Sequence, residues 1–223
     1  IDANSVVISP DCRRLACLAK AGDKVSVMVD GVAGKQYDAI SRYPEFAAMY
    51  LLFSPDSRRL AHTARVGDKW VLVVDGLEGK QYDEISIEFS FTRKSPYDVF
   101  SPDGARTAYF ARLGNKWMVV VDGTEGRQYE GFEEYCLAFS TDSQRLAYTA
   151  YQGNKFIVVT DGVEGKQYDS FGTMSTIFSP NSKRLAYIAS QGNKWFVVVE
   201  GIEGERYDGI KGGDRYLTGK YRS

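Results

Sequence analysis

The chain has 223 residues, 43% of them hydrophobic, and its 28 lysines and arginines nearly balance 29 aspartates and glutamates, for a formal net charge of −1. This length and apolar content suffice for a large core, so we expect a soluble globular protein. No basic patch or tail points to nucleic acid, and no apolar run approaches the roughly 20 residues of a membrane helix. We therefore expect a monomer with neither nucleic-acid partner nor membrane span.

A unit of about 40 residues occurs five times and organises the whole chain. The first landmark is an apolar residue before a turn, at Ile8, Phe53, Phe100, Phe139 and Phe178, with spacings of 45, 47, 39 and 39. The second landmark is a tyrosine after a D/E-G-x-x-G segment, at Tyr37, Tyr82, Tyr129, Tyr168 and Tyr207, with the same spacings. Two landmarks that move together indicate a structural repeat, and this period is typical of propellers and helical solenoids.

In chain order, the repeats make up one predicted domain, residues 1–223. The chain divides into repeats at about 5–45, 46–91, 92–131, 132–170 and 171–210, followed by a tail at 211–223. The tail leaves the pattern. It is interpreted either as the beginning of a sixth repeat or as a strap across the others.

Each repeat contains four short predicted strands and no helix. In the last repeat these are TIFSP at 176–180, RLAYIA at 184–189, KWFVVVE at 194–200 and GERYD at 204–208. All have ordinary strand length, and no stretch shows the 3.6-residue apolar period of a helix. The links are short and rich in Gly, Asp, Asn and Pro, which favour turns. Each repeat is therefore predicted to be a four-stranded antiparallel meander.

The third strand of each repeat indicates how these sheets pack. Residues 70–74 and 117–121 are apolar at every position, whereas a sheet with one wet face alternates apolar and polar residues. Both faces of each sheet must therefore be covered. Sheets stacked around an axis achieve this, so we predict an all-β, five-bladed β-propeller of four-stranded antiparallel blades, with a sixth blade if the chain continues beyond its ends.

The first two strands also resemble a known family. FSPDSRRLAH at 53–62, FSPDGARTAY at 100–109, FSTDSQRLAY at 139–148 and FSPNSKRLAY at 178–187 are similar to the repeat signature of TolB-type, WD-like β-propellers. The resemblance covers about residues 5–208 and implies a bacterial binding or scaffolding module, with a periplasmic or secreted location slightly favoured. The D-G-x-E-G-K-Q-Y-D segment departs from that family, so the resemblance implies no particular partner.

Two repeats carry long insertions, predicted to lie in the links from the fourth strand to the first strand of the next repeat. The stretch from Tyr37 to Phe53 is about six residues longer than in the last two repeats, and that from Tyr82 to Phe100 about eight longer. Both links are expected on one face, carrying residues 39–52 and 84–99. Loops on a rigid scaffold commonly bind partners, and aromatic side chains mixed with charges form recognition surfaces. The alternative is that these residues only fold the insertions onto the blades. The predicted ligand-binding residues are Arg42, Tyr43, Phe46, Tyr50, Phe89, Phe91, Arg93, Lys94, Tyr97 and Asp98.

Two further patterns have a binding interpretation and a structural one. The first residue of the third strand is aromatic in four repeats, which would suit sugar stacking. Packing between blades is favoured because the first repeat has valine there. These residues are Val25, Trp70, Trp117, Phe156 and Trp195. Acid pairs such as Asp75 and Glu78 would suit weak Ca²⁺ binding. A nearby Lys80 competes with a cation, so turn capping and ion pairing are favoured.

Catalytic interpretations have little support in the sequence. His62 is the single histidine, and its second-strand position predicts a core residue; a catalytic triad or zinc site needs more. A five-bladed glycosidase would place paired carboxylates on inner strands, and Asp98 with Glu133 or Glu134 is the available set. Cys12, Cys17 and Cys136 are odd in number and unevenly spaced, so they are expected to be ordinary core or turn residues.

The sequence thus predicts a non-enzymatic scaffold that binds a protein or peptide through the face carrying the insertions, without metal or cofactor. Two alternatives stay open: a multivalent carbohydrate-binding propeller with one pocket per blade and, with less support, a glycoside hydrolase.

Overall fold

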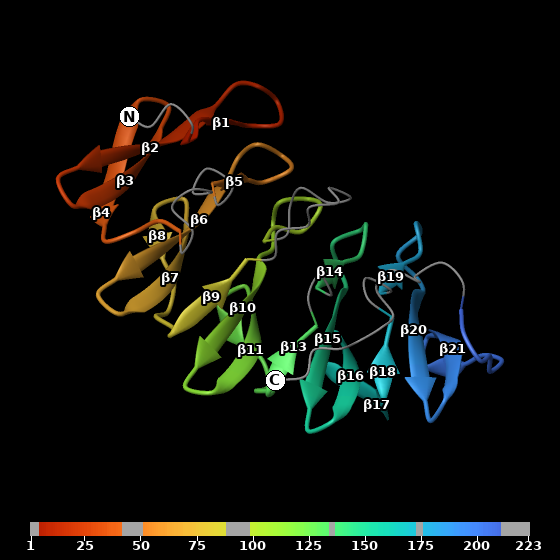
Figure 1. The fold of residues 1–223 in the computed structure, drawn as a ribbon. Helices are drawn as coiled ribbons and strands as arrows, with labels where there is room; N and C mark the ends of the chain where they lie inside the picture. Colours follow the sequence, from red (N-terminus) through yellow and green to blue (C-terminus); the bar gives the residue numbers. More distant parts are fainter. Residues whose placement is uncertain (1–4, 42–50, 88–98, 134–136, 173–175, 211–223) are drawn as a thin grey trace. The chain divides into compact units, whose positions relative to one another are not determined.

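The computed structural model describes residues 5–41, 51–87, 99–133, 137–172 and 176–210, which form five antiparallel sheets (Figure 1). The chain divides into two compact units, residues 1–126 and 127–223. Each unit is described by itself. We call the sheets blades 1 to 5 in chain order.

The first unit contains blades 1 to 3. Blade 1 consists of β1 (Val7–Ile8), β2 (Leu15–Ala21), β3 (Lys24–Val29) and β4 (Val32–Tyr37). Blade 2 consists of β5 (Leu52–Phe53), β6 (Leu60–Val66), β7 (Lys69–Val74) and β8 (Leu77–Glu78). Blade 3 consists of β9 (Glu84–Ser86), β10 (Ala108–Leu113), β11 (Lys116–Val121) and β12 (Thr124–Glu125).

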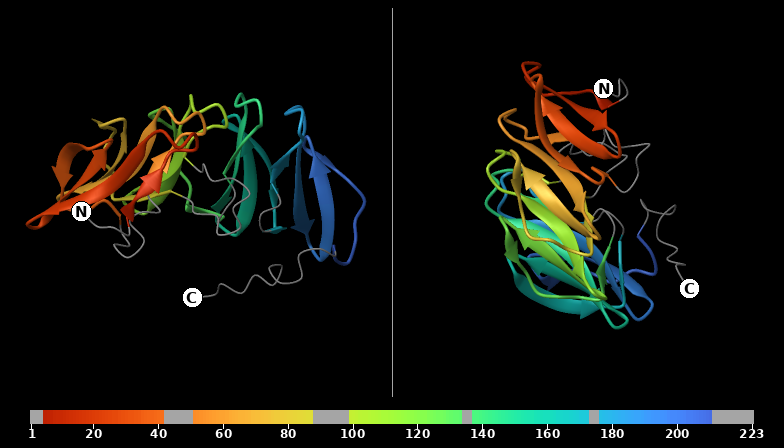
Figure 2. Two further views of the ribbon diagram at one scale, coloured as in Figure 1. Left: turned by 90° about the horizontal axis from the view of Figure 1, so that it is seen from above. Right: turned by 90° about the vertical axis from the view of Figure 1, so that its left-hand side faces the viewer.

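The second unit contains blades 4 and 5, each with a first strand in two pieces. Blade 4 consists of β13 (Gly131–Phe132), β14 (Ala138–Phe139), β15 (Leu146–Gln152), β16 (Lys155–Thr160) and β17 (Val163–Tyr168). Blade 5 consists of β18 (Ser170–Phe171), β19 (Ile177–Phe178), β20 (Leu185–Gln191), β21 (Lys194–Val199) and β22 (Ile202–Glu203). From two further directions, each sheet is a twisted meander in chain order (Figure 2). The predicted all-β class and four-stranded propeller blades are confirmed.

Two-residue turns join the third and fourth strands. Between β3 and β4, Asp30 and Gly31 have φ values of 52° and 84°, and positive φ at both positions is the requirement of a type I′ hairpin. The turn between these strands is therefore two residues long. The second glycine of the motif has a different role, because a Cβ on Gly34 would lie 3.1 Å from the carbonyl oxygen of Val27. At this point β3 bulges against β4.

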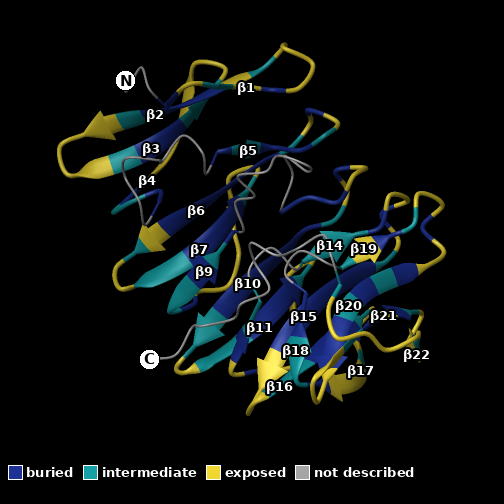
Figure 3. Ribbon diagram, turned by 45° about the vertical axis from the view of Figure 1, so that its right-hand side comes forward, coloured by how far each residue is buried: buried dark blue, intermediate teal, exposed yellow. Residues whose placement is uncertain are grey.

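The hydrophobic core lies between neighbouring blades rather than inside any one of them. One cluster joins blades 1 and 2, a second joins blades 2 and 3, and a third joins blades 4 and 5. Burial is concentrated on the long middle strands, such as β6, β15 and β20, while the turns are exposed (Figure 3). Both faces of blade 2 are therefore covered by neighbouring blades, as its apolar third strand predicts. None of the described residues belongs to a helix with the length and hydropathy needed to cross a membrane.

The first strand of each later blade is interrupted in its middle. In blade 5, the edge strand advances six residues over 171–177 while its partner β20 advances three over 186–189. Blade 4 has the same step, with six residues over 132–138 against three over 147–150. Even the compact blades therefore carry three extra residues at this point.

The two insertions lengthen this same interruption. In blade 2 the edge strand advances thirteen positions from Ala39 to Leu52 while its partner moves four, from Arg65 to Ala61. In blade 3 it advances fourteen from Ser86 to Phe100 while its partner moves three, from Phe110 to Thr107. The prediction that the insertions lie in the links between blades is wrong. The prediction that both lie on one face concerns residues outside the described part of the chain. The chain already pairs with the next blade directly after Tyr37, since the Arg65 amide donates to the Ala39 carbonyl at 2.8 Å. The insertions thus leave from within the edge strands.

Candidate functional site

All ten predicted ligand-binding residues lie outside the described part of the chain. Four belong to the segment 42–50 and six to the segment 88–98; they are Arg42, Tyr43, Phe46, Tyr50, Phe89, Phe91, Arg93, Lys94, Tyr97 and Asp98. Glu134, the partner of Asp98 in the glycosidase hypothesis, and Cys136 also lie outside it. The binding surface therefore stays a prediction, and the structure describes the residues that hold these segments.

Buried residues hold both ends of each insertion. Ile40 and Leu51 flank the first, and both belong to the core between blades 1 and 2. Ile87 and Val99 flank the second, and both belong to the core between blades 2 and 3. All four side chains are at most 6% exposed. Each insertion therefore leaves from and returns to a fixed point of the scaffold.

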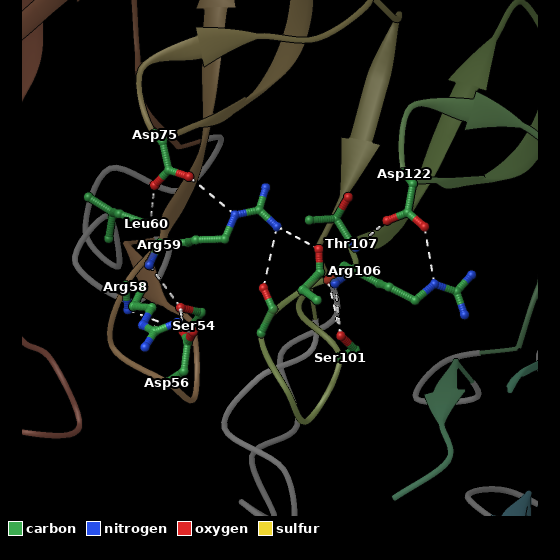
Figure 4. A network of polar contacts seen from close by, with 12 residues as sticks. Ser54, Asp56, Arg58, Arg59, Leu60, Asp75, Ser101, Arg106, Thr107 and Asp122 are labelled. Atoms are coloured by element: carbon green, nitrogen blue, oxygen red, sulfur yellow. Dashed lines mark hydrogen bonds and ion pairs between the residues drawn. The ribbon is translucent and has the colours of Figure 1, made fainter. Parts of the chain in front are cut away.

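The D-G-x-E-G-K-Q-Y-D motif makes contacts within its own blade and with the neighbouring blade of the same unit. Its first aspartate closes its own blade: the Asp75 carboxylate accepts hydrogen bonds from the Leu60 amide at 2.9 Å and from Arg59 Nε at 3.2 Å (Figure 4). The Arg59 guanidinium also donates to the Ala105 carbonyl oxygen in blade 3, at 2.8 Å. Arg106 and Asp122 repeat the pair one blade further along.

Later residues of the motif make contacts between neighbouring blades. Lys35 Nζ lies 2.7 Å from Glu78 Oε1 in blade 2. The Asp38 carboxylate accepts from the Gly67 amide at 2.8 Å, at the turn between β6 and β7. The hydrogen bond from Lys24 has the larger effect and that from the Gly67 amide the smaller, and together they hold the pKa of Asp38 below its ordinary value. Asp75 and Glu78, the acid pair considered for Ca²⁺, have different partners. This agrees with turn capping and ion pairing rather than with a shared cation.

The aromatic position at the start of the third strand packs against the cores. Val25, Trp70 and Phe156 are partly buried, and each contacts the core cluster between its blade and a neighbour. Trp117 is also partly buried, with the Arg112 guanidinium 5.7 Å from its ring centroid. These contacts confirm the packing role predicted for the position.

His62 is a core residue, as predicted, but it also lines a pocket. The side chain is 5% exposed, and Nδ1 lies 3.2 Å from the Thr63 carbonyl oxygen. Desolvation lowers the pKa of His62 to about 4, so the ring is neutral at physiological pH. The pocket has a volume of about 420 Å³ between blades 1 and 2. Its polar and charged lining residues are Arg14, Lys35, Tyr37, Arg58, His62 and Asp75.

Tyr37 adds a second buried polar group to this pocket. Its hydroxyl has no hydrogen bond of ordinary length within the described part of the chain. Burial, together with the nearby Glu78 carboxylate, raises the pKa of this hydroxyl, so it stays protonated. A buried hydroxyl without a partner is costly. The Tyr37 hydroxyl is fully buried beside the Glu78 carboxylate, so it forms part of the wall of the pocket.

The sequence marked both unusual residues of this pocket without bringing them together. Ala33 stands where the other repeats have glutamate, and His62 stands where blades 3 to 5 have tyrosine. Both line the same pocket. They belong to different repeats, so only the packing of blade 1 on blade 2 joins them. The signal in the sequence that could have indicated this pocket is that two neighbouring repeats each depart from the common pattern at one position, Ala33 and His62.

Cys12 and Cys17 have the structural roles expected of them. Cys12 occupies the turn before β2 with φ of 59°, where Ser57 and Ser182 also have positive φ. Cys17 is buried, and both thiols are free. Within the described residues, no three His, Cys, Asp or Glu side chains come together as a metal site would require.

Comparison with known proteins gives fold-level likenesses only. No protein-family model and no curated protein matches the sequence. TolB from Acinetobacter baumannii matches with a TM-score of 0.43 and 14% identity, over 91% of this chain and 56% of TolB. A eukaryotic initiation factor matches with a TM-score of 0.45 and 15% identity, over 90% of this chain and 53% of that protein. The Dos1 propeller matches with a TM-score of 0.40 and 11% identity, over 86% of this chain and 54% of Dos1. This chain spans little more than half the length of each. TolB is among the structures that it resembles, and the fold class rests on the five sheets.

Proposed function

We propose that this chain is a non-enzymatic binding propeller that recognises a protein or peptide through its two insertions, residues 42–50 and 88–98. One observation carries the proposal: both insertions lengthen the same interruption of the edge strand, in neighbouring blades, between buried anchors. A scaffold that holds two loops in this way suits recognition.

The composition of the insertions supports a protein or peptide partner. Together they contain six of the aromatic residues predicted to bind, along with arginines, a lysine and acids. Aromatic and arginine side chains are enriched in the residues that dominate binding energy at protein interfaces. The described framework uses its own recurring charges within and between blades, so the insertions hold the part of the sequence that the repeat does not explain.

The test is binding of the intact labelled protein to a combined peptide and glycan array. The test variant changes Phe46, Phe89, Phe91 and Tyr97 to alanine. A matched control removes four other apolar side chains, each more than 70% exposed beside the turns between third and fourth strands: Val32, Leu77, Val163 and Ile202 to alanine. Peptide binding that the test variant loses and the control keeps is the expected result.

Three outcomes would overturn the proposal. Glycan binding that survives the test variant would support one sugar pocket per blade. Hydrolysis of a glycoside that stops in Asp98→Asn would support the enzyme hypothesis. Peptide binding retained by the test variant would contradict the insertions as the binding surface.

A further inference from the structure

The pocket between blades 1 and 2 has a counterpart between blades 4 and 5, and the two are lined by equivalent positions. Arg145, Glu164 and Tyr187 of the second pocket correspond to Arg14, Ala33 and His62 of the first. The second pocket measures about 210 Å³, half the volume of the first. The change from glutamate to alanine and from tyrosine to histidine shortens two lining side chains, which accounts for the added space.

The two pockets also differ in charge. The lining of the first contains three cationic residues, Arg14, Lys35 and Arg58, against Asp75. The lining of the second contains one cationic residue and two acids. The larger pocket therefore has more cationic side chains in its lining than the smaller one. Arg14 and Lys35 are already paired with Asp30 and Glu78, which leaves Arg58 as the most available cation.

Arg58 is suited to contact an entering ligand. Its side chain is 85% exposed, and its ion pair with Asp56 is long, at 3.8 Å. A pair this exposed contributes little to stability, so turning the guanidinium toward a ligand costs little. A guanidinium binds a carboxylate with two parallel hydrogen bonds.

His62 defines a second requirement of the ligand. The Thr63 carbonyl oxygen can only accept, so the Nδ1 that faces it carries the proton. The other nitrogen, Nε2, then has a lone pair, and the described residues give it no hydrogen-bond donor. A ligand hydroxyl would donate to Nε2.

From this geometry we propose that the pocket between blades 1 and 2 binds a small hydroxylated carboxylate of about monosaccharide size, such as a uronic acid. The carboxylate contacts Arg58, and a ligand hydroxyl donates to His62 Nε2. Val27, Val29 and Val73 supply an apolar wall against which the C–H face of a sugar ring packs. This site is separate from the insertions and independent of the peptide-binding proposal.

The single histidine makes the test direct, because its ring resonances need no further assignment. The full chain, labelled with ¹⁵N, is titrated with D-glucuronate while the His62 ring nitrogens are followed by NMR. A saturable shift of Nε2 with one site per chain is expected. D-Glucose, which lacks the carboxylate, should bind at least tenfold more weakly, or about 1.4 kcal/mol.

Two variants locate the site. Ala33→Glu restores the residue of the other repeats, reduces the space and adds a negative charge, and should weaken binding at least tenfold. Arg58→Gln changes an exposed side chain and should weaken glucuronate binding severalfold without altering the unfolding midpoint. An Nε2 resonance that glucuronate does not move, or a response equal for glucose and glucuronate, would overturn the proposal. So would a response that both variants retain in full.

Discussion

The junction between blades 1 and 2 and the junction between blades 4 and 5 follow one plan but differ at its centre. In the second junction, Tyr168 packs edge-on against Tyr187 and Phe196, with ring centroids 6.2 and 5.7 Å away. In the first, Tyr37 has His62 as its aromatic neighbour, at 6.0 Å. One junction is a filled aromatic cluster, and the other has a larger, more cationic pocket.

The comparison separates what the repeat maintains from what it allows to change. Both junctions keep the buried tyrosine and the outer ion pair, Lys35 with Glu78 and Lys166 with Glu203. These contacts hold neighbouring blades together, so they recur. Two lining positions differ, Ala33 and His62 in the first junction against Glu164 and Tyr187 in the second, and these differences define a distinct chemical environment.

The largest expected effect is on the filled junction. Tyr168→Ala removes a ring that is 1% exposed and should reduce the free energy of unfolding by about 3–5 kcal/mol, as for other large buried aromatic side chains. Tyr37→Ala should cost less, because its ring lies beside the wider pocket. Urea unfolding followed by tryptophan fluorescence measures both, and an equal or larger loss for Tyr37→Ala would contradict the comparison.

The next effect depends on pH and belongs to the first junction alone. The pKa of His62 is about 4 in the folded protein, against 6.5 as the ordinary value, so the unfolded chain binds more protons between these values. The stability from neutral His62 is complete above pH 6.5 and falls as the pH decreases toward 4, by about 3 kcal/mol in all.

His62→Tyr provides the control for this pH dependence. Its free energy of unfolding should be much flatter between pH 6.5 and 4.5, where the framework carboxylates, with lowered pKa values such as that of Asp38, remain ionised. Identical slopes in the two proteins would show that His62 does not titrate as a buried group.

The same substitution should also have a moderate effect at pH 7. Tyrosine at position 62 matches blades 3 to 5 and would fill part of the pocket, so His62→Tyr should stabilise the protein by about 1 kcal/mol, a usual gain for a change toward the repeat consensus. Thermal unfolding measures it. A destabilised variant would mean that the first junction is shaped differently from the others.

The smallest effect is expected at the outer ion pairs. Lys35→Gln and Lys166→Gln each remove one pair, whose lysines are 60% and 66% exposed. Each should cost about 0.5 kcal/mol or less, and the loss should shrink in high salt because ions screen exposed charges. Urea unfolding at low and high salt checks this, and a cost above about 1 kcal/mol would assign these pairs a larger role.

The sequence was sufficient to predict the blades but not how they interlock. Turn residues such as Asp30 and Gly31 act locally, so the strands and hairpins follow from each repeat alone. The position of the insertions depends on pairing with the next blade, as in the bridge between Ala39 and Arg65, and no residue within one repeat reveals that register. The pocket between blades 1 and 2 likewise depends on residues of two repeats, Ala33 and His62, so neither repeat alone predicts it.

The affinity of the best array peptide for two versions of the protein tests the central claim that the insertions are the binding element. In the altered version, Thr-Met-Ser, the sequence of residues 173–175 in compact blade 5, replaces both 42–50 and 88–98. The account predicts at least a thirtyfold rise in Kd, or about 2 kcal/mol, with an unchanged unfolding midpoint. An unchanged Kd in this folded variant would contradict it.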